Sequence, residues 1–177
     1  MSHYLCLQIV LMAKILLLSA THSYMDDTIL KQMEDCDEVW HAGDIGNLSV
    51  CDKIKAIKPL RAVWGNIDNH EARAEYKEEL IFEIEGKKVW MIHIGGYPGR
   101  YTAKIKKKLQ TLRPDIFICG HSHILKVIYD KEMQLLHLNP GSCGIYGIHQ
   151  IRTLLKFEIK DNHISNMQIV ELGAKKK

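Results

Sequence analysis

The stretch ILLLSATHS, residues 15–23, contains the pattern from which the fold can be argued. Its apolar run predicts a buried strand, which we place at residues 14–19 in a domain that begins near Met12. The strand is followed by a turn of small residues that leads to His22. Binding sites in α/β sheets form beyond the carboxyl ends of strands, so His22 is a candidate ligand.

An apolar strand followed by a short turn with a polar side chain occurs at four further places. These turns are HAGD, WGN, MIHIGG and CGHSH, and they present Asp44, Asn66, His93, and His121 with His123. Glycine in such turns lets the backbone come close to a bound group. Imidazole, carboxylate and amide ligands suit Mn²⁺, Fe²⁺ or Zn²⁺ better than Ca²⁺. The ordered series predicts a metal site, and a carboxylate shared by two ions would make it a binuclear hydrolytic centre.

The order of elements predicts one α/β domain built on two packed sheets. Strands alternate with helices in the first two thirds of the chain, and the last third is typical of antiparallel hairpins. We expect helices over residues 26–34, 48–59 and 101–114, strands near 37–44, 60–66 and 115–123, and hairpins over 80–96, 124–142 and 152–172. Residues 67–77 show no clear pattern.

Length and composition are those of an ordinary soluble domain, with 177 residues, 46% apolar and 25% charged. The net charge is only +3, and the lysine runs 106–108 and 175–177 contain no aromatic residues, so a nucleic-acid partner is not expected. Five widely spaced cysteines favour reduced thiols and a cytoplasmic location.

The apolar segment 5–18 does not predict a membrane span or a signal peptide. Lys14 interrupts it, and it is shorter than the roughly 20 residues that cross a bilayer. We therefore interpret residues 1–11 as a leader outside the domain, residues 12–172 as the domain and residues 173–177 as a basic tail. No membrane partner is expected.

The series His, Gly-Asp, Gly-Asn, His, Gly-His-x-His resembles the calcineurin-like metallophosphoesterase superfamily, whose own pattern begins with Asp-x-His. The chain looks most similar to the compact, uncapped branch of prokaryotic phosphodiesterases, to which the eukaryotic retromer scaffold subunit is related. The resemblance covers about Met12 to Leu172 and includes LNPGS at 138–142. It implies a four-layer αββα sandwich of two mixed β-sheets.

The resemblance also implies a centre with two divalent metal ions, Mn²⁺ before Zn²⁺, Fe²⁺ or Ni²⁺. It implies hydrolysis of a small phosphorylated substrate, more specifically a phosphodiester, by a metal-bound hydroxide, with Asp44, Asn66 and His93 as catalytic residues. The implied ligands are His22, Asp44 and His123 for the first metal, and Asp44, Asn66, His93 and His121 for the second, with Asp44 as the bridge.

Two positions depart from the family pattern. Ala20 stands where the family has its first Asp, so the first metal site is expected to be weak or empty. This loss leaves open a rival interpretation, a non-catalytic scaffold or binding protein on the same fold. Ile67 stands where many members carry a His that assists the leaving group, so activity is expected to favour substrates with good leaving groups.

Three further polar residues near these turns each have two interpretations. His41 would support a ligand or pack within its strand; Asp68 would hydrogen-bond a ligand or cap the next segment; Arg100 would bind phosphate or form a surface ion pair. The histidines assigned to structural or exposed positions are His3, His70, His137, His149 and His163. Exposed hairpin edges could pair between subunits, so a homodimer is a further expectation.

Overall fold

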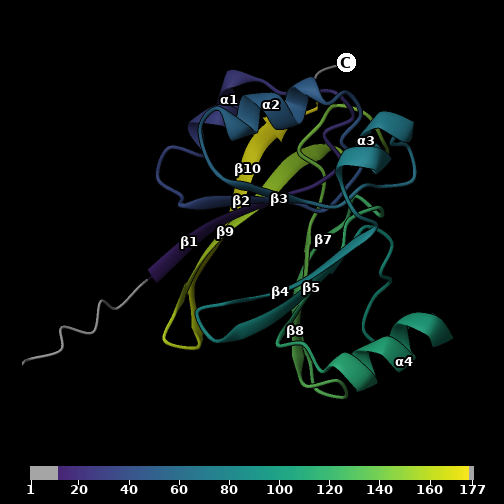
Figure 1. Ribbon diagram of the computed structural model, residues 1–177. Helices are drawn as coiled ribbons and strands as arrows, with labels where there is room; N and C mark the ends of the chain where they lie inside the picture. The colour runs from purple at the N-terminus through teal and green to yellow at the C-terminus, as the bar shows by residue number, and fades with distance from the viewer. Residues whose placement is uncertain (1–11, 176–177) are drawn as a thin grey trace, which may run out of the picture.

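The computed structural model describes residues 12–175 and contains two five-stranded sheets (Figure 1). The first sheet has the order β10-β9-β1-β2-β3, and its strands are β1 (Met12–Leu18), β2 (Glu38–His41), β3 (Leu60–Ala62), β9 (Ile151–Lys160) and β10 (His163–Ala174). The second has the order β4-β5-β6-β8-β7, with β4 (Glu79–Ile84), β5 (Lys87–Ile92), β6 (Ile116–Ile118), β7 (Leu125–Asp130) and β8 (Leu135–Pro140). The central strands pair in parallel and β9, β10, β4 and β7 pair antiparallel, which confirms two mixed sheets.

Alternation along the strands divides the apolar residues into separate layers. On β1, Ile15 and Leu17 face the space between the sheets, whereas Leu16 belongs to a cluster on the outer side. On β5, Met91 lies between the sheets and Trp90 lies on the outer side. Successive side chains of a strand point to opposite faces, so both sheets are buried on both sides. This is why these strands have nearly continuous apolar sequences.

The helices cover the outer faces of the sandwich (Figure 1). Those of the described residues are α1 (Asp27–Lys31), α2 (Ser49–Lys55), α3 (His70–Glu75) and α4 (Ala103–Leu112). Helices α1 and α2 pack on the first sheet through Ile29 and Ile54, and α4 packs on the second through Ile105 and Leu109. The predicted αββα layering is confirmed.

Several elements are shorter than the sequence predicts. The helix expected over 26–34 is α1 followed by turns, the one expected over 48–59 is α2, and only Ile116–Ile118 of the strand expected over 115–123 is extended. The unassigned stretch 67–77 contains α3, whose first turn is capped by the Asn69 side chain accepting from the Ala72 amide. All three hairpins are confirmed.

The ends of the chain bear on the predicted domain limits. Strand β10 continues to Ala174, whereas the proposed leader, residues 1–11, and the last two residues of the basic tail lie outside the described residues. The longest helix between residues 12 and 175, α4, has 10 residues, so no helix in this range is long and apolar enough to cross a membrane.

Candidate metal centre

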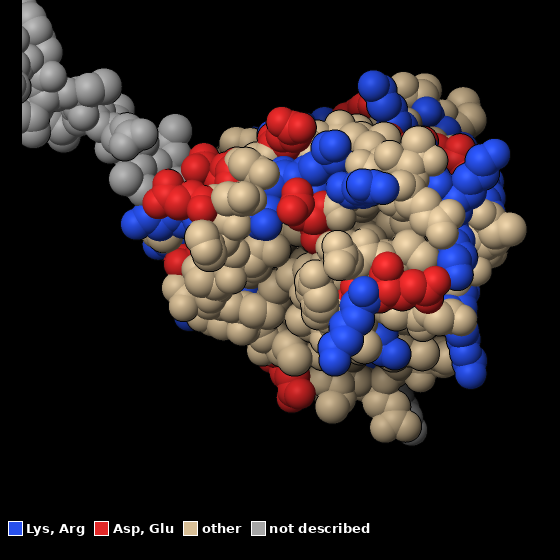
Figure 2. Space-filling model, turned by 90° about the horizontal axis from the view of Figure 1, so that it is seen from below, with Lys and Arg blue, Asp and Glu red and all other residues tan. Residues whose placement is uncertain are grey.

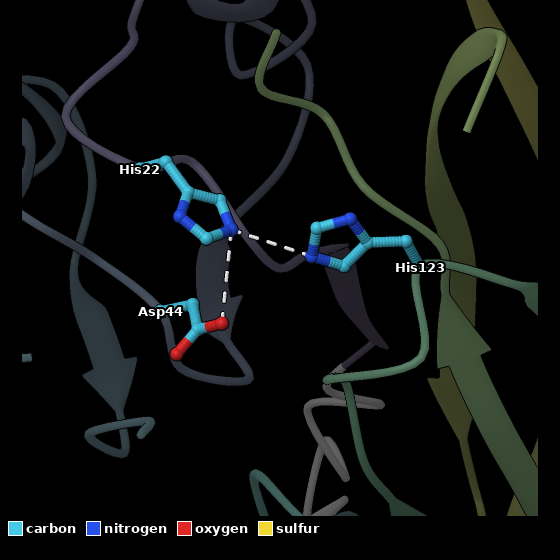
Figure 3. Close-up of side chains that lie close together, drawn as sticks. All are labelled: His22, Asp44 and His123. Carbon is cyan, nitrogen blue, oxygen red and sulfur yellow. Dashed lines mark hydrogen bonds and ion pairs between the residues drawn. The ribbon is translucent and has the colours of Figure 1, made fainter. Parts of the chain in front are cut away.

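The turns after β1, β2, β3, β5 and β6 meet at one end of the sandwich and bring the predicted ligands together. In the first group, the Nε2 atom of His22 lies 3.7 Å from Oδ2 of Asp44 and 3.3 Å from Nε2 of His123. The three side chains point toward one another from three separate turns (Figure 3). Their ligand atoms all lie within 4.8 Å of one another, a spacing at which one ion can contact all of them.

The second group lies on the other side of Asp44. Nε2 of His93 is 3.1 Å from Oδ1 of Asp44 and 3.2 Å from Oδ1 of Asn66, and Nδ1 of His121 is 2.8 Å from the same Asn66 oxygen. The ligand atoms of Asp44, His93 and His121 also lie within 4.8 Å of one another. Asp44 therefore belongs to both groups, with one carboxylate oxygen toward each.

The donor chemistry of the second group fits a cation. Nδ1 of His93 lies 2.7 Å from the carbonyl oxygen of Ala42. A carbonyl can only accept, so Nδ1 carries a proton, and in the tautomer protonated there the Nε2 atom presents a lone pair. That lone pair faces the oxygens of Asp44 and Asn66, which are acceptors as well. Three converging acceptors repel one another unless a positive charge lies between them.

Burial favours the neutral, ligating form of one histidine in each group, His123 in the first and His121 in the second. Burial, followed by the nearby rings of His22 and His149, lowers the pKa of His123 to about 4. Burial and then His93 also lower the pKa of His121. Burial alone would raise the pKa of Asp44, but His93, the Ile67 amide and His22 outweigh it, and the pKa lies below the ordinary value. At neutral pH the centre combines the Asp44 carboxylate with neutral rings at His121 and His123.

The backbone at this end adopts an unusual conformation. Positive φ angles occur at Ala20 (55°), His22 (47°), Asp44 (58°), His121 (66°) and His123 (57°). Residues other than glycine rarely adopt this left-handed region, and such strain gathers at functional sites. The remaining positive-φ residues other than glycine and Ser23 lie away from the centre, in turns, at a helix end (Arg113) or at an irregularity in β10 (Asn166).

Two glycines make room for the ligands. A Cβ atom at Gly65 would lie 2.2 Å from Oδ1 of Asp44, and one at Gly43 would lie 2.5 Å from Nδ1 of His93. Both distances are far below contact, so no other residue fits without moving the ligands. The glycines of the HAGD and WGN motifs are therefore explained by close packing around Asp44.

Ala20 occupies the position of the expected carboxylate. It is fully buried, its amide donates to the Gly43 carbonyl at 2.9 Å, and its own carbonyl accepts from the Ser142 hydroxyl at 3.1 Å. Alanine at φ 55° costs about 1–2 kcal/mol, a cost that aspartate and asparagine bear more readily through local hydrogen bonds. The backbone conformation of this turn therefore suits an aspartate at position 20 better than the alanine that occupies it.

His41 and Asp68 support the turns and do not belong to either group. His41 is buried, accepts from the Gly43 amide at Nδ1 and contacts Oγ1 of Thr21 at 2.9 Å, and burial followed by His93 lowers its pKa to about 3. Asp68 accepts from the amides of Gly46 and Gly65, both at 2.7 Å. Asp68 therefore joins the Asp44 turn to the Asn66 turn, and Asn69, not Asp68, caps α3.

Arg100 lies exposed on the loop after His93, and its side chain forms no ion pair within residues 12–175. The predicted surface ion pair is not seen there, and phosphate binding stays a prediction.

Asn139 and His149 lie at this centre although neither was predicted there, and His149 was assigned to a structural or exposed position. The buried Asn139 amide donates to the Gly120 carbonyl at 2.8 Å and to the Ser122 hydroxyl at 3.2 Å, so it holds the GHSH turn in place. The ring of His149 packs edge-on against His123, with centroids 5.3 Å apart. The LNPGS motif was the available signal for Asn139; nothing in the sequence pattern indicated His149.

A family comparison agrees with this geometry. Residues 13–162 match the model of the calcineurin-like phosphoesterase superfamily domain. The chain belongs to this superfamily. A probable metallophosphoesterase of Methanothermobacter thermautotrophicus is 30% identical over 120 residues, which are 68% of each chain. Members of this superfamily are metal-dependent phosphoesterases, so the chain belongs to a family of hydrolases.

Solved structures of similar fold include members with different described roles. A predicted phosphoesterase from Streptococcus pneumoniae superposes with a TM-score of 0.70 at 22% identity, over 92% of this calcineurin-like chain and 91% of that one. An archaeal phosphodiesterase gives 0.66 at 19% identity, over 89% and 99%. Vps29 of Entamoeba histolytica, in complex with Zn²⁺, gives 0.65 at 18% identity, over 90% and 99%. At these identities the likeness concerns the fold.

Proposed function

We propose that this chain is a metal-dependent phosphodiesterase with a binuclear centre. The observation that carries the proposal is the position of Asp44, whose two oxygens face two separate groups of candidate ligands. His22, Asp44 and His123 would hold one cation, and Asp44, Asn66, His93 and His121 the other. We propose Mn²⁺ as the metal, since nitrogen and oxygen ligands together suit it.

The residues of the chain prepare this end of the sandwich for a phosphate ester. When bound, divalent cations neutralise charge on the phosphoryl oxygens and activate water for attack. Asp44 supplies negative charge between the two groups, and the Ile67 amide fixes its Oδ1 by donating to it at 3.2 Å. His93 is held by Ala42, so its Nε2 atom needs no reorientation to accept a ligand.

A second candidate function is a scaffold that keeps the fold without turnover. Ala20 favours it, since the first group has lost a negatively charged ligand. The six remaining ligand positions favour the enzyme, because they are still gathered within bonding reach of common centres.

The test is hydrolysis of an activated aryl phosphodiester with Mn²⁺ by the unchanged chain and by Ala20→Asp. Ala20→Asn is the matched control, because asparagine also tolerates the left-handed backbone but lacks the full charge. A gain of at least about tenfold for Ala20→Asp over Ala20→Asn supports the enzyme, since even indirect supports of a metal contribute that much. Absence of hydrolysis from all three proteins would establish the scaffold instead.

Ile67 limits the chemistry of the leaving group. Its side chain is 45% exposed beside Asn66 and cannot donate a proton to a departing alkoxide. We therefore expect the rate to fall steeply as the pKa of the leaving alcohol rises, measured over a series of substituted aryl diesters. Ile67→His should flatten this dependence; an unchanged slope would remove Ile67 from the explanation.

We also propose a cellular location, a class of partner and an oligomeric state for the protein. Cys36, Cys51, Cys119 and Cys143 are buried and unpaired, which is consistent with a cytoplasmic protein. Acidic and basic side chains are interspersed on the face seen in Figure 2, which agrees with a small phosphorylated substrate rather than a nucleic acid. The edge strand β7 exposes Ile128 and Tyr129, and we propose a homodimer through this edge, to be tested by light scattering of the intact chain.

A further inference from the structure

A pocket of about 150 Å³ opens directly beside the second group. Asn66 and His93, two of the proposed ligands, form part of its wall. A group seated in this pocket would therefore be next to any phosphate held at the metal centre. The pocket has no assigned role in the proposed hydrolysis, which concerns the phosphorus atom and not the organic part of the substrate.

The rest of the wall combines apolar side chains with two charged ones, Arg73 and Glu78. Trp64 lies on one side, and Ile92 and Ile94 line another part. Ile94 is 51% exposed, directly after His93 in the chain. A large apolar side chain half-exposed at the mouth of a pocket gains from being covered by an apolar ligand.

Arg73 of α3 fixes the shape of the pocket. Its guanidinium lies over the Trp64 ring, 4.5 Å from the centroid. Its Nε and Nη2 atoms donate to the carbonyls of Asp68 and Asn66 at 2.8 and 3.2 Å. The cation–π contact and these two hydrogen bonds hold Trp64 in place before any ligand arrives, which lowers the entropic cost of binding.

We propose that this pocket binds a single aromatic ring carried by the ester group of the substrate. The inference rests on the proposed phosphodiesterase function and names its substrate class, an aromatic phosphoester. A cavity of about 150 Å³ accommodates benzene in another protein, so one ring fits and a fused pair does not. The indole ring and the planar guanidinium favour a flat partner over an alkyl chain.

Binding measurements with Mn²⁺ present test the ring without requiring turnover. Phenyl phosphate and uridine 5′-monophosphate carry an aromatic ring; butyl phosphate and ribose 5-phosphate are their counterparts without one. By calorimetry we expect Kd at least about tenfold lower for one ring-bearing ligand than for its counterpart. The pair with the larger difference identifies the source of the ring as an aryl ester or a pyrimidine nucleotide.

Tryptophan fluorescence locates the bound ring. The sequence has three tryptophans, and Trp40 and Trp90 are fully buried, so a ligand in the pocket reaches Trp64. The ring-bearing ligand should change the emission of the unchanged chain and not that of Trp64→Leu. Ile94→Asn should remove the ring preference, whereas Ile81→Asn, at a position 47% exposed on β4, should keep it.

Equal affinity for ligands with and without a ring, or a ring preference that survives in Ile94→Asn, would overturn the inference. Hydrolysis of diesters without any ring preference would refute the pocket and leave the proposed function standing. Ring-dependent binding in a chain that hydrolyses nothing, even as Ala20→Asp, would refute the function and leave the pocket as a binding site.

Discussion

The two groups of ligands share Asp44 but differ in how firmly the fold holds their other members. In the second group, His93 donates through Nδ1 to the Ala42 carbonyl at 2.7 Å, and Asn66 contacts two imidazoles. In the first group, His22 contacts Asp44 and His123, and no hydrogen bond within residues 12–175 holds the Nδ1 atom of either histidine.

This difference indicates that the two sites are unequal before any metal binds. Partners that orient a ligating histidine change metal affinity by about 10- to 100-fold, and the first group lacks both these partners and the carboxylate at position 20. We therefore expect the second group to fill first. Because Asp44 belongs to both groups, loss of its carboxylate should weaken both sites at once.

The largest expected effect comes from Asp44→Asn, which removes the shared charge and abolishes the distinction between the groups. Asparagine tolerates the left-handed backbone at φ 58°, so the fold should persist. In the Ala20→Asp background we expect Mn²⁺-dependent activity to fall by at least about a thousandfold, because both cations lose a ligand. Asp161→Asn, at φ 47° in the β9–β10 turn, is the matched control and should leave activity unchanged.

The next largest effect is a loss of stability in acid, which limits the pH range over which the two groups of ligands can be compared. His137 is fully buried on β8, and burial, followed by the charge of Lys126, lowers its pKa to about 4 from the ordinary 6.5. Between pH 6.5 and pH 4, His137 binds a proton in the unfolded chain but stays neutral in the folded chain. The stability that depends on a neutral His137 is therefore fully present above pH 6.5. As the pH falls to 4, the free energy of unfolding decreases by roughly 3 kcal/mol.

Thermal melts from pH 7 to pH 4 measure this term. His137→Gln should lose less stability over that range than the unchanged chain, since glutamine does not titrate. His163→Gln, at the exposed start of β10, should melt with the unchanged dependence on pH. Parallel curves for all three proteins would remove His137 from the explanation of acid sensitivity.

The smallest expected effect makes the two groups more alike. Ala20→Asp should raise the Mn²⁺ affinity of the first group by at least about tenfold, so that a titration shows two ions where the unchanged chain binds one tightly. Ala20→Asn should stabilise the turn without this gain in metal. If both variants bind one ion, the first group is not a metal site.

Much of this arrangement could be predicted from the sequence because strand ends and turn glycines follow local rules. The apolar runs before His22, Asp44 and His93 indicate strands, and parallel pairing puts the carboxyl ends of β1 and β2 at one edge of the first sheet and those of β5 and β6 at one edge of the second. The layers also follow from near-continuous apolar strands, which are buried on both faces.

The parts that could not be predicted depend on distant contacts or on very short elements. Helix α3 has six residues, too few for a periodic pattern to emerge, yet it supplies Arg73 to the pocket. Asp68 could be interpreted as a cap or a ligand partner until the fold placed the Gly46 and Gly65 amides against it. The approach of His149 to His123 depends on a loop whose path has no local sequence signal.

The left-handed turn at Ala20 has an evolutionary consequence. A single base change converts some alanine codons to aspartate codons, and the surrounding backbone already has the shape that aspartate prefers. Under selection for hydrolysis of phosphodiesters, Ala20→Asp variants should therefore arise early and without accompanying changes elsewhere in the gene.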